Sequence, residues 1–167
     1  MILDNLLTVS GAISAAGVIS GQLVTSLGNT VSTNTIDLAN ATSNNQTSDF
    51  GQGTELEIEI SILQTLTSGG AATVQFQLIQ ATDAALTTSI DVINQTDAIA
   101  FATLTAGTLV ALHWDRAAPL APKRYIGVRY VVGTAALTNG TGQFFASVGK
   151  NIQDVRNIYL RSGFSIS

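Results

Sequence analysis

The sequence predicts an all-β fold, an antiparallel β-sandwich of the jelly-roll type, and three observations predict it. Several stretches alternate apolar and polar residues with a period of two, as strands with one buried face do. Turn-forming Gly, Asn, Ser and Thr separate these stretches at short intervals. No stretch keeps an apolar stripe at the helical period for three turns. The best helix candidate, residues 11–24, is weakened by Gly11, Gly17 and Gly21.

The length of 167 residues fits one domain with its own core, and the composition divides it into three parts. Residues 1–50 contain the polar run "SLGNTVSTNT" and most of "NATSNNQTSDFGQG". They are predicted to form an extended N-terminal segment that packs on the domain or reaches from it. Residues 51–148 are the predicted sandwich core. Residues 149–167 mix charged and apolar side chains and form a predicted C-terminal tail.

The strand with the clearest pattern is "ELEIEISIL", residues 55–63. Its alternation places three glutamates on one face and apolar side chains on the other. The next strand, residues 72–82, alternates in the same way, and "TSGGA" at 67–71 lies between the two. We therefore expect these strands to form a hairpin. The acidic face consists of Glu55, Glu57 and Glu59, and the apolar face of Leu56, Ile58, Ile60 and Ile62.

Five other runs are strand candidates because they are rich in apolar and β-branched residues and end at turn-forming ones. In chain order they are residues 33–39, 98–104, 108–114, 124–132 and 142–148. The dipeptide Asn139-Gly140 predicts a turn between the last two.

Charge is scarce in this chain and unevenly distributed. Charged residues make up 11% of it, against about 25% in an average soluble domain, and the mean hydropathy is +0.34. Ser, Thr, Asn and Gln, together with contacts to other chains, are expected to cover the surface. Residues 1–115 hold ten of the eleven acidic residues and no basic one, whereas residues 116–167 hold all seven basic residues.

The separation of charge raises a question about partners. Three glutamates on one strand face repel one another unless positive charge lies opposite. Arg124 or Arg129 could supply that charge within the fold, or a basic patch on another subunit could supply it. The sequence leaves both arrangements open.

Several classes of function are disfavoured. In "HWDR", residues 113–116, His113 and Asp115 share a strand face with little room for a nucleophile, so we expect no catalysis and read Trp114 as a core residue. With one His and no Cys, a transition-metal site is not expected, and no cofactor is; loop carbonyls with Asp91 or Asp97 are the remaining candidates for Ca²⁺. A net charge of −4 argues against nucleic acid as the partner.

We expect neither membrane insertion nor export. Residues 5–36 carry no charge, but Ser, Gly and Gln recur every few positions, which makes the segment too polar for a membrane span. No Lys or Arg precedes its apolar part, so the positively charged start of a secretory signal is missing.

Five segments, taken in order, resemble the cementing (decoration) proteins of tailed-bacteriophage capsids. They are "MILDNLLTVSGAIS", "TNTIDLA", "ATVQFQLIQATD", "RYIGVRYVVGT" and "IQDVRNIYLRSGFSIS". The resemblance implies a jelly-roll-like fold and no enzymatic activity. It also implies a homodimer or homotrimer that binds the major capsid protein on the outer surface of the virion and is made in the bacterial cytoplasm.

The resemblance supplies no contact residues. As a mechanistic hypothesis, residues 1–35 and the tail lie across capsid subunits while the sandwich forms the core of the oligomer. The candidate residues for a capsid or subunit interface are Asp4, Leu6, Arg156, Tyr159, Arg161 and Phe164.

Two other classes of function remain as alternatives. The stronger one is a carbohydrate-binding or adhesion module, because jelly rolls also serve lectins. Sugar rings commonly stack on exposed aromatic residues, and Trp114 and Tyr130 are the candidates for such a platform. The weaker one is a hydrolase that depends on His113.

Overall fold

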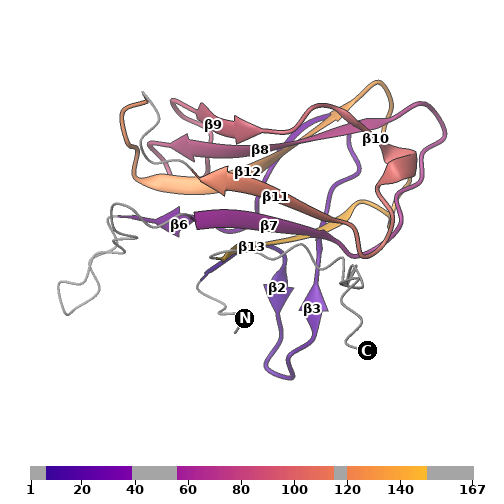
Figure 1. Cartoon of the computed structure of the whole chain (residues 1–167), viewed down its shortest axis with the longest axis horizontal. Coiled ribbons are helices and arrows are strands. Elements are labelled where there is room, and N and C mark those ends of the chain that lie inside the picture. Colours follow the sequence, from indigo (N-terminus) through magenta and orange to yellow (C-terminus); the bar gives the residue numbers. More distant parts are fainter. Residues whose placement is uncertain (1–6, 39–55, 115–119, 150–167) are drawn as a thin grey trace, which may run out of the picture.

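The computed structural model describes residues 7–38, 56–114 and 120–149, and these form an all-β fold of two antiparallel sheets packed face to face (Figure 1). A short 3-10 helix, η2 (Phe101–Thr103), interrupts the strands. The predicted antiparallel sandwich is confirmed, and the jelly-roll pattern of connections stays a prediction. The helix candidate at residues 11–24 is wrong, because this segment contains three short strands, β2 (Ala12–Ile13), β3 (Ile19–Ser20) and β4 (Gln22–Leu23).

The first sheet has β13 and β7 at its centre. Its order is β1 (Thr8–Ser10), β13 (Gln143–Gly149), β7 (Leu56–Ile62) and β11 (Leu109–Trp114), with β4 (Gln22–Leu23) also paired to β13. The burial pattern of β7 alternates strictly, as its sequence predicts. Leu56, Ile58, Ile60 and Ile62 are buried, and the residues between them are only half-buried.

The second sheet is built around the long pair β8 (Thr73–Ala81) and β12 (Tyr125–Gly133). These nine-residue strands pair along their whole length, with Phe76 opposite Tyr130. Shorter strands continue the sheet on either side. They are β10 (Ile99–Ala100) and β9 (Asp91–Gln95) on β8, and β5 (Gly28–Val31) and β6 (Ile36–Asp37) on β12.

Two sequence expectations about individual strands need correction. The run 98–104 forms only the short strand β10 before η2 begins at Phe101. Leu104 ends that helix and is 1% exposed, so its burial comes from a turn and not from a strand. In the run 33–39, β6 is likewise confined to Ile36–Asp37.

The predicted hairpin between residues 55–63 and 72–82 is also wrong. Strand β7 pairs with β11 and β13 in the first sheet, whereas β8 pairs with β9, β10 and β12 in the second. The connection between them crosses one end of the sandwich. Leu66 on this connection is buried, and its backbone N–H donates to the carbonyl of Leu104 at 3.1 Å. Burial of Leu66 therefore holds the chain in a crossing path that the Gly-Gly signal does not reveal.

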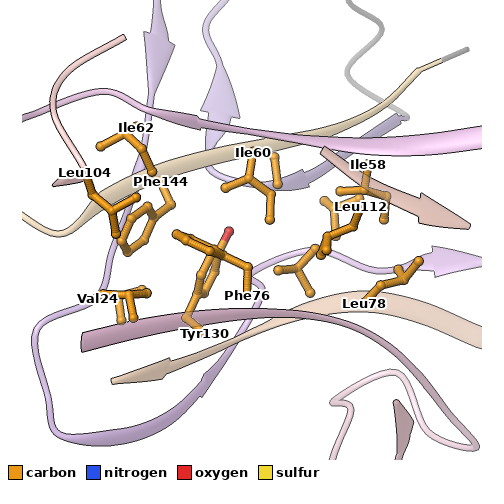
Figure 2. Close-up of a cluster of buried hydrophobic side chains, with 14 of the residues drawn as sticks. Val24, Ile58, Ile60, Ile62, Phe76, Leu78, Leu104, Leu112, Tyr130 and Phe144 are labelled. Carbon is orange, nitrogen blue, oxygen red and sulfur yellow. The ribbon is translucent and has the colours of Figure 1, made fainter. Parts of the chain in front are cut away.

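Three aromatic rings join the two sheets at the centre of the core (Figure 2). Phe144 of the first sheet stacks on Tyr130 of the second at 4.8 Å between centroids, with an angle of 16° between the rings. Phe76 meets both rings edge-on, at 5.5 Å from Phe144 and 6.0 Å from Tyr130. Offset and edge-to-face ring pairs add about 0.5–1.5 kcal/mol beyond burial of their area. The cluster therefore fixes how the sheets lie on each other.

The Tyr130 hydroxyl lies inside this core. Burial raises the pKa of Tyr130, and the nearby Ser10 hydroxyl lowers it by a smaller amount. Ser10 donates its own hydrogen to Gln22 Oε1 at 2.6 Å, and the Tyr130 hydroxyl makes no hydrogen bond of ordinary geometry with the described residues. Its position in the core reflects packing of the ring.

Candidate functional site

His113 is the sequence's only histidine. His113 is exposed on β11, an edge strand of the first sheet, and its register partner is Glu57 on β7. Its backbone carbonyl accepts a hydrogen bond from Asn94 Nδ2 at 2.9 Å, which links β11 to β9 of the facing sheet. Trp114 is 4% exposed, which confirms its reading as a core residue. Asp115 and Arg116 lie outside the described residues.

The glutamates of β7 lie on a different sheet from Arg124 and Arg129, the arginines that the sequence offers as possible partners. Glu57 and Glu59 belong to the outer face of the first sheet, while Arg124 and Arg129 belong to the second-sheet side. Because the sheets pack through their inner faces, their outer faces point in opposite directions. Of the two arrangements that the sequence leaves open, pairing of these glutamates with Arg124 or Arg129 within the fold is therefore not made, and pairing with another subunit stays a prediction. Burial raises the pKa of Glu59 above its usual value. Glu55 lies outside the described residues.

The basic residues of the second sheet have partners of their own. Arg124 holds Asp37 with two hydrogen bonds of 2.8 Å, from Nε and Nη2, and this pairing raises the pKa of Arg124. Lys123 Nζ lies 2.7 Å from Asp91 Oδ2 and also donates to the Ser89 carbonyl. The hydrogen bond from Lys123, and a further one from Gln80, lower the pKa of Asp91. Both ion pairs hold loops and strand ends against β12.

The ion pair between Lys123 and Asp91 also occupies one of the two candidate Ca²⁺ ligands. Asp91 is engaged by Lys123 and Gln80, and the Asp97 carbonyl accepts the Thr96 hydroxyl at 2.8 Å. The described residues contain no group of three His, Asp or Glu side chains placed to bind a metal ion together. Within those residues, no helix has the length and apolar character needed to cross a membrane.

An amide cluster occupies part of the outer face of the second sheet. Gln77 Nε2 donates to Gln95 Oε1 at 2.8 Å and to Gln75 Oε1 at 3.2 Å, and Arg129 Nε donates to Gln77 Oε1 at 2.6 Å. Gln75 Nε2 in turn donates to the Thr96 carbonyl at 2.9 Å. These bonds link the three glutamines to one another, to Arg129 and to the Thr96 backbone. The cluster gives the sheet a polar surface with little charge.

Neither aromatic residue proposed as a sugar platform is exposed. Tyr130 is 0% exposed and Trp114 is 4% exposed, and both belong to the main core cluster. A ring enclosed on both faces cannot stack on a sugar. The structure therefore contradicts the feature on which the carbohydrate-binding alternative depended.

Exposed apolar side chains gather in the N-terminal segment. Val18 is 63% exposed, Ile19 39%, Leu23 48% and Leu27 60%. Val18 and Ile19 lie at a short hairpin formed by β2 (Ala12–Ile13) and β3 (Ile19–Ser20), which extends away from both sheets in Figure 1. This hairpin is the surface feature of the described chain that most resembles a contact site.

Sequence reasoning named other residues for the interface. Asp4, Leu6, Arg156, Tyr159, Arg161 and Phe164 all lie outside the described residues. The hypothesis that residues 1–35 lie across capsid subunits includes Val18 and Ile19 without singling them out, although the sequence carries a signal for them. Residues 5–36 carry no charge, and apolar residues there are interspersed with Gly and Ser. Apolar side chains that are exposed in such a segment form an uncharged surface.

The described residues define an all-β sandwich protein whose most distinctive surface feature is a group of exposed apolar side chains in the N-terminal segment. A family model, Bbp16, matches residues 18–148, which include most of both sheets. The chain belongs to the Bbp16 family, a phage protein family, and this membership indicates a phage structural protein. The comparison with curated proteins gave no match.

Proposed function

We propose that the protein is a capsid-cementing protein, which binds the outer surface of a phage shell and holds neighbouring major capsid subunits together. The observation that carries this proposal is the Bbp16 match over residues 18–148. Under this proposal the sandwich has jelly-roll connections and forms a homodimer or homotrimer on the virion. It needs no cofactor and has no enzymatic activity.

The chemistry of the described residues supports a structural role. The two ion pairs and the amide cluster use their polar groups to hold strands and loops together. What remains for a partner is a weakly charged surface with exposed apolar residues. A protein that acts by shape and contact area needs such a surface and does not need titratable groups.

Cementing follows from binding linkage. A protein that binds the mature, expanded shell and not its precursor stabilises the expanded state by an amount that grows with its concentration and affinity. Because shell subunits repeat, each modest contact also recurs, and linked contacts bind more tightly than a single one. Modest affinity per site is therefore sufficient.

The decisive experiment is co-sedimentation of the purified protein with shells of its major capsid protein, before and after expansion. We expect saturable binding to expanded shells and a higher melting temperature of the shells that carry it. Binding that is absent from both forms would refute the cementing role. Binding that leaves the melting temperature unchanged would reduce the protein to a passive decoration.

A further inference from the structure

The hairpin of residues 12–20 is a small unit outside the two large sheets. Its two strands pair Ala12 with Ser20 and Ile13 with Ile19, and they form a separate two-stranded sheet. At the tip, the Ser14 N–H donates to the Val18 carbonyl and the Gly17 N–H donates to the Ser14 carbonyl, both at 2.9 Å. The Ser14 hydroxyl also accepts the Val18 N–H at 3.0 Å. The turn therefore has a defined shape.

Contacts with the sandwich hold the base of the hairpin. Gly11 has φ +83°, and a Cβ there would lie 2.3 Å from the Ser20 carbonyl oxygen, so only glycine fits. Gln22 lies just after the hairpin, and its Oε1 accepts the Ser10 hydroxyl at 2.6 Å and the Thr33 N–H at 2.9 Å. Its Nε2 donates to the Val31 carbonyl at 2.7 Å. The hairpin thus projects from an anchored base.

The side chains that this unit presents are apolar. Of the five large hydrophobic residues that are exposed in the described part of the chain, Val18 and Ile19 lie on the hairpin, and Leu23 and Leu27 follow shortly after it. Two-residue strands gain little from pairing alone, and a two-stranded hairpin is marginally stable in water. Exposure of Val18 and Ile19 has no role in holding the fold, and a cluster of exposed apolar residues commonly marks an interaction site.

Resting on the proposed function, we infer that the hairpin of residues 12–20 is a docking element that inserts into an uncharged groove formed by the major capsid protein. Its shape is convex, because it extends from the sandwich (Figure 1), so a concave surface is its complement. The segment has no charged residue between positions 5 and 36. A charged groove would lose its hydration here without gaining a counter-charge, and the complement must therefore be uncharged.

The size of the hairpin agrees with a repeated contact. Nine residues bury less than the roughly 1,000 Å² that a specific interface requires by itself. The hairpin is therefore one anchor of a larger contact, and the repetition of subunits on a shell supplies the rest. Because apolar burial is insensitive to screening, the hairpin's share of binding does not weaken as salt rises.

The test uses the full chain with Val18→Ser and Ile19→Ser combined. A matched control is Leu120→Ser, since Leu120 is 37% exposed, close to the 39% of Ile19, and lies elsewhere on the surface. Both proteins should keep the melting temperature of the unmodified chain, because the altered side chains are exposed. We expect binding of the double variant to expanded shells to be weaker by about tenfold or more. The control should bind like the unmodified chain, at low and at high salt.

The outcomes distinguish failure of the docking role from failure of the proposed cementing function. Equal binding by the double variant and the unmodified chain would overturn the docking role and leave cementing intact. No binding by the unmodified chain would refute the proposed function, and the docking role with it. If the double variant keeps its shell affinity but loses self-association in sedimentation velocity, the hairpin contacts a second copy of this chain instead, which also overturns the inference.

Discussion

The charged form of Glu59 is disfavoured by the partly buried position of its side chain. It lies on the half-buried outer side of β7, and burial raises the pKa of its carboxyl above 4.5. The folded state therefore binds a proton more readily than the unfolded chain in the pH interval just above that value. Stability contributed by the protonated form is present below pH 4.5 and is lost as pH rises through the folded-state pKa.

Replacing Glu59 by Gln tests this linkage. The variant should melt at a higher temperature than the unmodified protein at neutral pH, because glutamine has no charge that partial burial would disfavour. The difference should vanish below pH 4.5, where Glu59 is protonated. Melting curves across pH, followed by circular dichroism, measure the effect. Ser61→Ala, on the same face of β7, is the control and should give a difference that does not vary with pH. A gain that persists in acid would contradict the explanation.

At the residue scale, sequence reasoning was right where it followed the strand period. Trp114 was expected in the core and lies there. Tyr130 was treated as a possible platform, yet the alternation of "RYIGVRYVV" already places it on the same face as Val128 and Val132. All three are buried, while Arg129 between them is only half-buried. The strand period, and not the residue type, determines the burial of the Tyr130 ring.

Among the elements, the connection of residues 82–90 forms a cover on the second sheet. Leu86 on this loop is 1% exposed and belongs to a small second core with Ile79 and Ala81. The Asp83 carboxylate accepts the backbone N–H groups of Thr87 and Thr88, which closes the turn. The loop therefore adds apolar burial on an outer face that is otherwise polar.

The close approach of Leu86 to Gly127 makes this cover testable. A Cβ at Gly127 would lie 2.3 Å from Leu86 Cδ1 and 2.8 Å from Ser32 Oγ. Leu86→Ala should lower the free energy of unfolding by about 2 kcal/mol or more, and Gly127→Ala should also destabilise. In the double variant the smaller side chain at position 86 makes room for the new Cβ at position 127. The free energy of unfolding of the double variant should therefore fall by about 1 kcal/mol less than the sum of the two single losses.

Urea unfolding of the four proteins in this double-mutant cycle measures the coupling. Strict additivity would show that contact between Leu86 and residue 127 does not determine either effect. In that case the clash with Ser32 alone would explain the loss caused by Gly127→Ala.

Also at the element scale, the sequence predicted most long strands but mispaired two of them. The alternating burial expected of β7 is confirmed, whereas β8 alternates only as far as Phe76 and is buried on both faces from there to Ala81. A strand that turns back within its sheet and one that crosses to the facing sheet bury the same alternate residues. The difference depends on Leu66 and on contacts with distant Leu104, which local turn residues cannot encode.

For the whole molecule, the aromatic cluster predicts cooperative unfolding. Phe144, Tyr130 and Phe76 come from both sheets and pack together, so neither sheet keeps its inner face buried without the other. Phe144→Leu should reduce the free energy of unfolding by about 1–2 kcal/mol, through lost ring contacts and a residual cavity. It should leave a single transition.

Two probes test this cooperativity. Fluorescence of Trp114, the only tryptophan in the sequence, reports on the first sheet, and far-ultraviolet circular dichroism reports on both sheets. The two urea curves should coincide in the unmodified protein and in the variant. Separate midpoints would show that the sheets unfold independently.

The sandwich class could be predicted at this scale because the strand period and frequent turns are local properties of the sequence. Apart from the run 33–39, which contains β6, the N-terminal contribution to the sheets could not. Short polar runs such as "SLGNTVSTNT" have little apolar pattern, yet Gly28–Val31 forms β5 along β12. Here a neighbouring long strand determines the structure by offering its unpaired edge.

The place of β13 in the first sheet also has a consequence during synthesis. β13 lies between β1 and β7, and it pairs Thr8 with Ser147, near opposite ends of the chain. When β7 has just emerged from the ribosome, the nascent chain therefore still lacks β13, the strand that joins β7 to β1. Such distant pairings slow folding, and here they delay closure of the sheet until β13 has been synthesised. The first sheet therefore cannot close before residues 143–149 have left the ribosome.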